Sequence, residues 1–368
     1  MVVWLWIGFI LFVLVMLALD LGVFNREAHV ISTREALRWT GLCVVLALVF
    51  TGFVYFAYEH HLFGIGLHHS DVKSGWDGAV KFLAGYIVEQ SLSLDNIFVI
   101  ALIFSYFRIP RIYQHRVLFW GIIGALIMRG AMIILGTQLL EHFKWMIYVF
   151  GGLLIVTAIK MMTAGEEPPE PDRNILVRIA RKFYPVAREL EGEKFFTRVP
   201  VSESIVRGFP PTVSETEELP HPVPIKPESA PDYPAGAPGT RRAMTPMFVC
   251  LLVIESTDVL FAIDSIPAIF AITQDPFIVF TSNVFAILCL RSMFFALSGM
   301  MHKFRYLKTS LVFLLAYIGV KMLLSAKIHI PTPFSLAVIA GILAVGVVAS
   351  LLSKTTPEES PDGSHSGS

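Results

Sequence analysis

Two acidic stretches inside apolar segments decide the fold of this chain. They read EQSLSLDNI at residues 89–97 and DVLFAIDSI at residues 258–266, and Glu255 stands three residues before the second. Each consists of an acid, five residues, an aspartate, a small polar residue and an isoleucine. A carboxylate in hydrocarbon costs about 2.5–3.5 kcal/mol on insertion scales. Five acids in two apolar segments therefore call for a function.

The composition is that of a membrane protein. The chain has 368 residues, of which 55% are hydrophobic and only 16% charged, whereas ordinary soluble domains have about 25% charged residues. Apolar runs of roughly 20 residues match the length that spans a bilayer. The net charge is zero, so no basic field indicates nucleic acid as a partner. The three cysteines, Cys43, Cys250 and Cys289, form no CxxC pair, which indicates neither a disulfide framework nor a zinc site.

These runs predict an all-α fold, a polytopic membrane protein with about nine transmembrane helices. The predicted spans are residues 2–24, 37–57, 79–106, 117–140, 143–163, 244–273, 277–300, 309–326 and 334–353. Basic residues concentrate in the loops between spans 1 and 2, 3 and 4, and 7 and 8. Because positive loops mark the cytoplasmic side, we expect the N-terminus outside and the C-terminus in the cytoplasm.

The chain divides into two membrane halves and a linker. We predict a first half over 1–163, a cytoplasmic linker over 164–243, a second half over 244–353 and a disordered tail over 354–368. The linker holds 14 of the 22 prolines and no apolar run.

An internal repeat connects the two halves. Units of three spans, 79–163 and 244–326, carry an aspartate, an arginine and a lysine in the same order, and the arginine and lysine are 31 and 30 residues apart. The residues are Asp95, Arg129 and Lys160 in one unit, and Asp264, Arg291 and Lys321 in the other. Three spans are an odd number, so the units enter the membrane from opposite faces. Inverted repeats of this kind place transporter sites near the midplane.

The acids could gather at one site only if a helix breaks or if both units contribute. Six residues of straight helix rise about 9 Å and turn to a position about 120° away, so Glu89 and Asp95 cannot both bind one small ion. Serine hydroxyls compete for backbone hydrogen bonds, and proline removes a backbone donor. We therefore predict both a site where Asp95 and Asp264 meet and local helix breaks. The predicted break positions are Ser91, Ser93, Ser265 and Pro267.

The expected ligands are hard oxygen donors, which suit Mg²⁺, Ca²⁺ or Mn²⁺ better than Cu or Zn. The candidate metal ligands are Glu89, Asp95, Asn96, Glu255, Asp258 and Asp264, with Asp20 of the first span as a vestibule ligand. For Asp20, an interfacial carboxylate near Arg26 is an equally good interpretation. Alternatively, Arg129 and Arg291 neutralise the acids as buried ion pairs. Six acids against two arginines leave an excess that calls for a cation or protons, so we predict that the arginines are counter-charges when the site is empty.

The acidic stretches resemble the two signature segments of the TerC family. Further similarity lies in YQHRVLFWG at residues 113–121 and DPFIV at residues 275–279, and the resemblance covers most of residues 1–353, without 210–240. It implies a bacterial inner-membrane protein of a family linked by name to tellurite resistance. Its Alx-like members imply manganese export through the motif acids. The choice of Mn²⁺, and of export over import, rests on this resemblance.

We expect a secondary transporter that exports divalent cations, with Mn²⁺ as the first candidate substrate and Ca²⁺ as the second, driven by proton antiport. The sequence has no GxxxxGK[ST] motif for ATP and no HExxH or GxSxG motif, so we expect neither an enzyme nor an organic cofactor. The expected partners are the lipid bilayer and the metal ion. The alternative is a membrane scaffold that aids assembly or metal loading and recruits protein partners through its linker.

Overall fold

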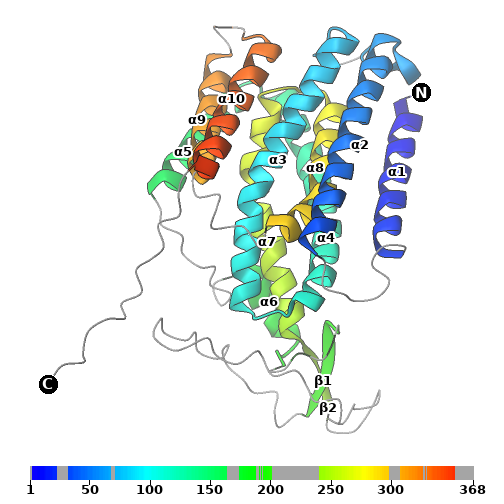
Figure 1. Cartoon of the computed structure of the whole chain (residues 1–368), viewed down its shortest axis with the longest axis vertical. Helices are drawn as coiled ribbons and strands as arrows, with labels where there is room; N and C mark the ends of the chain where they lie inside the picture. The colour runs from blue at the N-terminus through cyan, green and yellow to red at the C-terminus, as the bar shows by residue number, and fades with distance from the viewer. Residues whose placement is uncertain are drawn as a thin grey trace, which may run out of the picture.

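The computed structural model describes residues 2–22, 32–67, 71–163, 174–187, 190, 192, 194–200, 240–297, 307–325, 328 and 330–352. These residues form helices almost throughout (Figure 1). The elements are α1 (Val2–Gly22), α2 (Thr33–Glu59), the 3₁₀ turn η1 (Leu62–Gly64), α3 (Gly75–Tyr106), α4 (Arg111–His142), α5 (Met146–Thr163), α6 (Ile175–Phe183), β1 (Phe196–Pro200), β2 (Thr240–Met244), α7 (Pro246–Phe270), α8 (Pro276–Leu297), α9 (Leu307–Leu324) and α10 (Thr332–Leu352).

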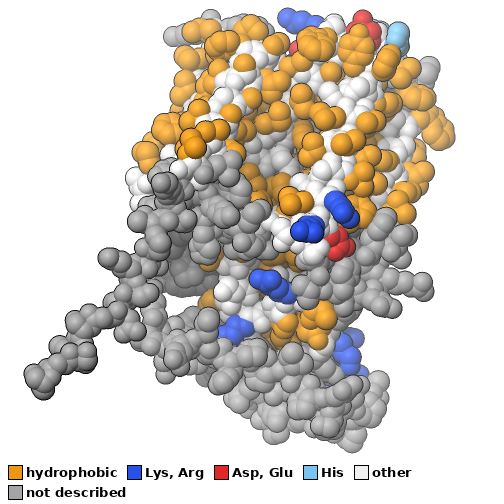
Figure 2. All heavy atoms as spheres, in the orientation of Figure 1, with side chains coloured by type: hydrophobic (Ala, Val, Ile, Leu, Met, Phe, Trp, Pro, Cys, Tyr) orange, Lys and Arg blue, Asp and Glu red, His pale blue; other side chains and the backbone are white. Residues whose placement is uncertain are grey.

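The predicted all-α polytopic membrane fold is confirmed. Each of the nine predicted spans coincides with a helix, α1 to α5 and α7 to α10. Within the described part of the chain, seven helices are long and apolar enough to cross a membrane, namely α2, α3, α4, α5, α7, α8 and α10, and α1 contributes a shorter apolar segment. The count of nine spans stays a prediction. Hydrophobic side chains cover much of the visible face of the helix bundle in Figure 2, as a surface facing lipid requires.

The helix ends follow from local sequence. The side chain of Ser74 accepts a hydrogen bond from the backbone N–H of Asp77 at 3.2 Å, which caps α3. Asp275 caps α8 in the same way, because its Oδ1 accepts from the N–H groups of Phe277 and Ile278. Pro246 occupies the first turn of α7, where its missing N–H leaves no hydrogen bond unmade.

The packing of the helices relates the two predicted repeat units. The first helix of one unit packs on the second helix of the other, so α3 contacts α8 and α4 contacts α7. The third helices, α5 and α9, pack on each other, and Gly151 and Gly319 let their backbones approach closely. α8 is the central helix: 83% of its most apolar 18-residue segment is buried, against 17% of the corresponding segments of α2, α5 and α10. The bundle therefore holds α8 inside and turns α2 and α10 outward.

Two predictions about local structure were wrong. α3 continues unbroken through Ser91 and Ser93, and α7 continues through Ser265 and Pro267. The Ser91 hydroxyl donates to the carbonyl of Ile87, four residues back, at 2.6 Å, so it adds to the helical turn without opening it. Pro267 removes one backbone donor near the end of α7, where its buried neighbours Ile266 and Ala268 keep the last turn packed.

The predicted linker contains a two-stranded sheet that the sequence analysis did not anticipate, and a helix over residues 175–183. β1 and β2 form a two-stranded antiparallel sheet in which Phe196 pairs with Met244. The short amphipathic helix α6 buries Val177 and lies at the same end of the bundle as this sheet (Figure 1). Residues 164–173 and 201–239 of the linker, and the tail from 353 onward, lie outside the described residues.

Candidate cation site

A fully buried ion pair lies at the centre of the bundle. Glu89 of α3 has no exposed surface, and its Oε2 lies 2.6 Å from Nη1 of Arg129 on α4. Asn283 of α8 closes a triangle, because its Nδ2 donates to Glu89 Oε1 at 2.8 Å and its Oδ1 accepts from Arg129 Nη1 at 2.9 Å. Both oxygens of Glu89 therefore have a hydrogen-bond partner, as a buried carboxylate requires.

Arg129 also reaches the second acidic stretch, but loosely. Its Nη2 lies 3.5 Å from Oδ1 of Asp258 on α7, and Asn96 Nδ2 lies 3.4 Å from the same oxygen. Within the described part of the chain, Asp258 Oδ2 and Asn96 Oδ1 are buried and have no hydrogen-bond partner. The side chain of Asp258 keeps 14% of its surface exposed, whereas Glu89 keeps none. Two oxygen acceptors thus remain available, one from the Asp258 carboxylate and one from the Asn96 amide.

A small cavity adjoins these acceptors. Its volume is about 30 Å³, and its polar lining consists of Asn96, Glu255, Thr257 and Asp258. Its other walls are apolar, among them Ile122, Phe261 and Leu290. A cavity of this size holds a water molecule or a bare ion, since one water needs about 10–15 Å³ by this measure.

Gly124 of α4 makes room for the Glu255 carboxylate. A Cβ at position 124 would lie 1.9 Å from Glu255 Oε1, so no side chain larger than hydrogen fits there without displacing the acid. At Gly121, one turn earlier, a Cβ would meet nothing closer than 3.7 Å. The close approach of Glu255 to α4 is therefore specific to position 124.

Asp264 has a different environment from Glu89. Thr157 of α5 donates to its Oδ1 at 2.8 Å, and Lys160 lies near it. Asp95 is half-buried on α3, and its predicted meeting with Asp264 stays a prediction. Arg291 is buried on α8, and its counter-charge role also stays a prediction. Position 20 belongs to α1, but the Asp20 side chain lies outside the described residues.

The structure groups some of the predicted ligands and separates others. Glu89, Asn96, Asp258 and Arg129 form one polar cluster, and Glu255 lines the cavity beside it. No three His, Cys, Asp or Glu side chains of the described ranges stand close enough together to hold a metal ion by themselves. The sequence analysis missed Asn283 and Thr157. The signal for Asn283 was an amide in the middle of an apolar span.

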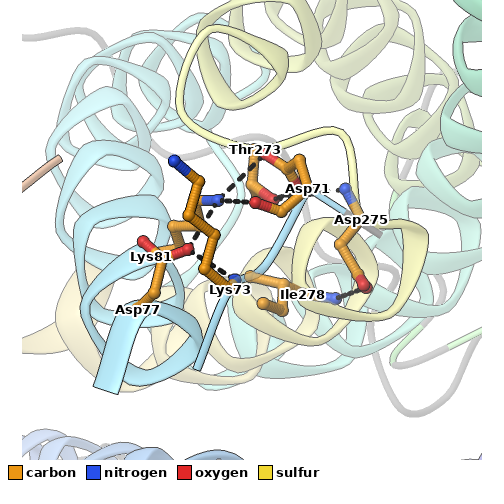
Figure 3. A network of polar contacts seen from close by, with 7 residues as sticks. All are labelled: Asp71, Lys73, Asp77, Lys81, Thr273, Asp275 and Ile278. Atoms are coloured by element: carbon orange, nitrogen blue, oxygen red, sulfur yellow. Dashed lines mark hydrogen bonds and ion pairs between the residues drawn. The ribbon is translucent and has the colours of Figure 1, made fainter. Parts of the chain in front are cut away.

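A second polar network lies where α3 begins (Figure 3). The ammonium group of Lys81, which is 6% exposed, lies 3.1 Å from Asp71 Oδ2 and 3.0 Å from Asp77 Oδ2. Thr273, in the connection between α7 and α8, donates to the other oxygen of Asp71 at 2.8 Å. The backbone carbonyl of Asp71 also accepts a hydrogen bond from this ammonium group, at 2.6 Å, so the network connects the start of α3 to the end of α7.

The chain is similar to known proteins over nearly its whole length. The family model described as "Integral membrane protein TerC family" matches residues 74–358. An "Uncharacterized membrane protein STKORF319" of Myxococcus xanthus is 44% identical over 359 residues, which are 97% of this chain and 95% of that protein. Proteins named "Putative membrane-bound redox modulator Alx" are 38% identical over 346 residues in Salmonella typhi and 37% identical over 343 in Escherichia coli K12. They cover 94% and 93% of this chain, and 92% of each relative. No solved structure matches the chain.

Proposed function

Because the chain belongs to the TerC family of integral membrane proteins, we propose that it is a secondary transporter that exports divalent metal cations, with Mn²⁺ as its substrate. One observation carries the proposal. The acids Glu255 and Asp258 line a small cavity inside the membrane domain, where Asp258 Oδ2 and Asn96 Oδ1 have no hydrogen-bond partner within the described ranges. Buried oxygen acceptors need a partner, and a hard divalent cation would supply one.

The charges of the cluster support a doubly charged substrate. Arg129 contacts the carboxylates of Glu89 and Asp258, and Glu255 lines the cavity beside Asp258, so this region holds three carboxyl groups and the guanidinium of Arg129. When all four are ionised, two negative charges remain in excess. Amide and hydroxyl oxygens from Asn96 and Thr257 complete a set of donors that suits Mn²⁺, Mg²⁺ or Ca²⁺. The cavity volume of about 30 Å³ argues against an organic solute.

We assign Arg129 the role of a counter-charge that moves only slightly. It is bound to Glu89 and Asn283 at 2.6 and 2.9 Å but to Asp258 at 3.5 Å, so its contact with Asp258 is the weaker one. A cation that enters the cavity would replace this contact while Arg129 stays on Glu89. Asp264, about 9 Å farther along α7 than Asp258, would be a second binding position on the transport path of the cation.

The helix packing supports an inverted repeat. The reciprocal contacts of α3 with α8 and of α4 with α7 are those expected of two units related by a pseudo-twofold axis in the membrane plane. We further propose an inner-membrane protein of nine spans with the N-terminus outside and the C-terminus in the cytoplasm, from the basic loops. Export of a cation against the membrane potential requires about 2.3 kcal/mol per charge per 100 mV, and we propose proton antiport as its source.

Uptake of Mn²⁺ into inverted membrane vesicles tests the proposal. Vesicles that contain the intact chain should accumulate Mn²⁺ and release protons, and Asp258→Asn should abolish both. A chain that lacks residues 205–238 should retain uptake if it is a transporter, whereas a scaffold that acts through its linker would lose its activity. Equal Mn²⁺ accumulation with the intact chain and with Asp258→Asn would contradict the proposed site.

A further inference from the structure

Two cysteines from distant parts of the sequence meet inside the membrane domain. Cys43 of α2 and Cys289 of α8 are in side-chain contact, and α2 packs directly on α8. Cys289 is fully buried, and Cys43 is half-buried against the same hydrophobic cluster. Five helices, α3 to α7, separate the two residues in the chain, so their sequence spacing gave no indication that they lie together. Both residues are free thiols in this structure.

Polar side chains lie around the Cys289 thiol and join α2 to α8 beside it. The Ser292 hydroxyl donates to the backbone carbonyl of Cys289 at 2.9 Å and accepts a hydrogen bond from Thr40 of α2 at 3.2 Å, and the Gln90 amide, also near Cys289, donates to Met293 Sδ. The Tyr86 side chain is only 5% exposed and faces Cys289, and its hydroxyl has no conventional hydrogen-bond partner in the described part of the chain. Cys250 of α7 is also fully buried, but the described interactions give it no second thiol.

The route to this pair leads through lipid. Cys43 stands ten residues after the start of α2, about 15 Å along the helix axis. Its neighbours Leu42 and Val44 are 43% and 37% exposed. Only 17% of the most apolar segment of α2 is buried inside the protein. An oxidant that reaches Cys43 must therefore dissolve in hydrocarbon.

We propose that Cys43 and Cys289 form a redox-active dithiol, which a lipid-soluble quinone oxidises to a disulfide between α2 and α8. The S–S bond forms and both S–H bonds break. The two electrons and two protons pass to the quinone, which leaves as the hydroquinone. Two molecules of a lipid-soluble thiol reverse the step by exchange: the first forms a mixed disulfide with one cysteine and frees the other, and the second frees the first cysteine and leaves with its partner as their own disulfide. The chemistry does not depend on the proposed transport. Because α8 also carries Asn283, the disulfide would attach a helix of the cation site to the outer helix α2.

Thiol counting on the full-length protein in lipid nanodiscs tests the proposal without any metal. The reduced protein is incubated with a fully substituted, short-chain benzoquinone, unfolded, alkylated and mapped by mass spectrometry. Two of the three thiols should disappear together, the disulfide should map to Cys43 and Cys289, and Cys250 should stay free. Cys250→Ser should react like the wild type, and Cys43→Ser and Cys289→Ser should each keep both remaining thiols.

Three outcomes would overturn the proposal. The wild-type protein could retain three free thiols after quinone treatment, or Cys43→Ser could lose thiols as the wild type does. A water-soluble, membrane-impermeant oxidant could also act as fast as the quinone, which would contradict the route through lipid. The wild-type mapping decides the first point even if a serine variant fails to fold.

Discussion

The two acidic helices begin from the same sequence pattern and hold their acids in different ways. On α3, both oxygens of Glu89 are bound, by Arg129 at 2.6 Å and by Asn283 at 2.8 Å, and the side chain has no exposed surface. On α7, Asp258 has one loosely bound oxygen and one without a partner within the described residues. The difference teaches that repeated acids need not share one role. In the proposed transporter, the acid of α3 would hold the site together and the acids of α7 would bind the substrate.

The neighbouring helices explain this asymmetry. α4 and α8 both direct a polar side chain, Arg129 and Asn283, at Glu89. At Glu255, α4 offers only Gly124, which provides space without a hydrogen-bond donor from its side chain. Among its described contacts Glu255 has no cationic partner, and under the proposed function a bound ion or a proton would compensate its charge.

The largest effect is expected at Arg129. Arg129→Met leaves Glu89 buried without its partner, which destabilises a protein by about 3–5 kcal/mol. The thermal unfolding temperature in detergent should fall sharply, and adding Glu89→Gln to this variant should restore most of it. If Arg129→Met alone unfolds at the wild-type temperature, Glu89 does not depend on a structural ion pair, and the proposed difference between α3 and α7 is wrong.

On α7, the corresponding change should alter transport without altering stability. Glu255→Gln removes a charge that has no arginine partner among its described contacts, so the unfolding temperature should stay near that of the wild type. Loss of one charge-assisted contact of about 1.5–3 kcal/mol should weaken Mn²⁺ binding about 10- to 100-fold. Uptake rates in inverted vesicles at several Mn²⁺ concentrations measure this. A large fall in stability with unchanged uptake would exchange the roles of the two helices.

Gly124→Ala sharpens the comparison without changing any charge. The new methyl group would collide with the Glu255 carboxylate, which is the flexible end of a side chain and can turn away. We expect the KM for Mn²⁺ to rise about tenfold, one unit of 1.4 kcal/mol, with a smaller change in the maximal rate. Gly152→Ala on α5 is the control, because its methyl group meets nothing within 4 Å and Gly152 does not line the cavity. Equal effects of the two variants would show that the position of Glu255 is unimportant.

The smallest effect is expected at Thr157. Thr157→Val removes the hydroxyl that donates to Asp264 at 2.8 Å, a hydrogen bond worth about 1 kcal/mol. Uptake should change by a few-fold. It should rise if the Thr157 hydroxyl must leave Asp264 before the ion binds, and fall if this hydrogen bond is still present when the ion binds. Thr163→Val, whose hydroxyl bonds only to carbonyls of its own helix in the described contacts, should leave uptake unchanged. A result equal to that control would remove Asp264 from the path.

The sequence predicted the helices better than the contacts between them. Long apolar runs and basic loops define spans locally, and each predicted span coincides with a helix. The excess of acids over arginines directed attention to α3 and α7, whose acids Glu89 and Asp258 both contact Arg129, and cation binding there stays a prediction. Spacing alone could not show that Asn283 bonds Glu89 across 194 residues, nor that Cys43 meets Cys289. The predicted helix breaks failed because a serine hydroxyl can return its hydrogen bond to its own helix, as Ser91 does.

The most direct test of the α7 acids is equilibrium binding of Mn²⁺ to the purified protein in lipid nanodiscs. Three proteins are compared: the wild type, Asp258→Asn, and the double variant Glu89→Gln with Arg129→Met, which removes one charge of each sign. We predict that Asp258→Asn loses Mn²⁺ binding and that the double variant retains it. Binding that survives in Asp258→Asn but disappears in the double variant would contradict the account, since the ion would then belong to α3.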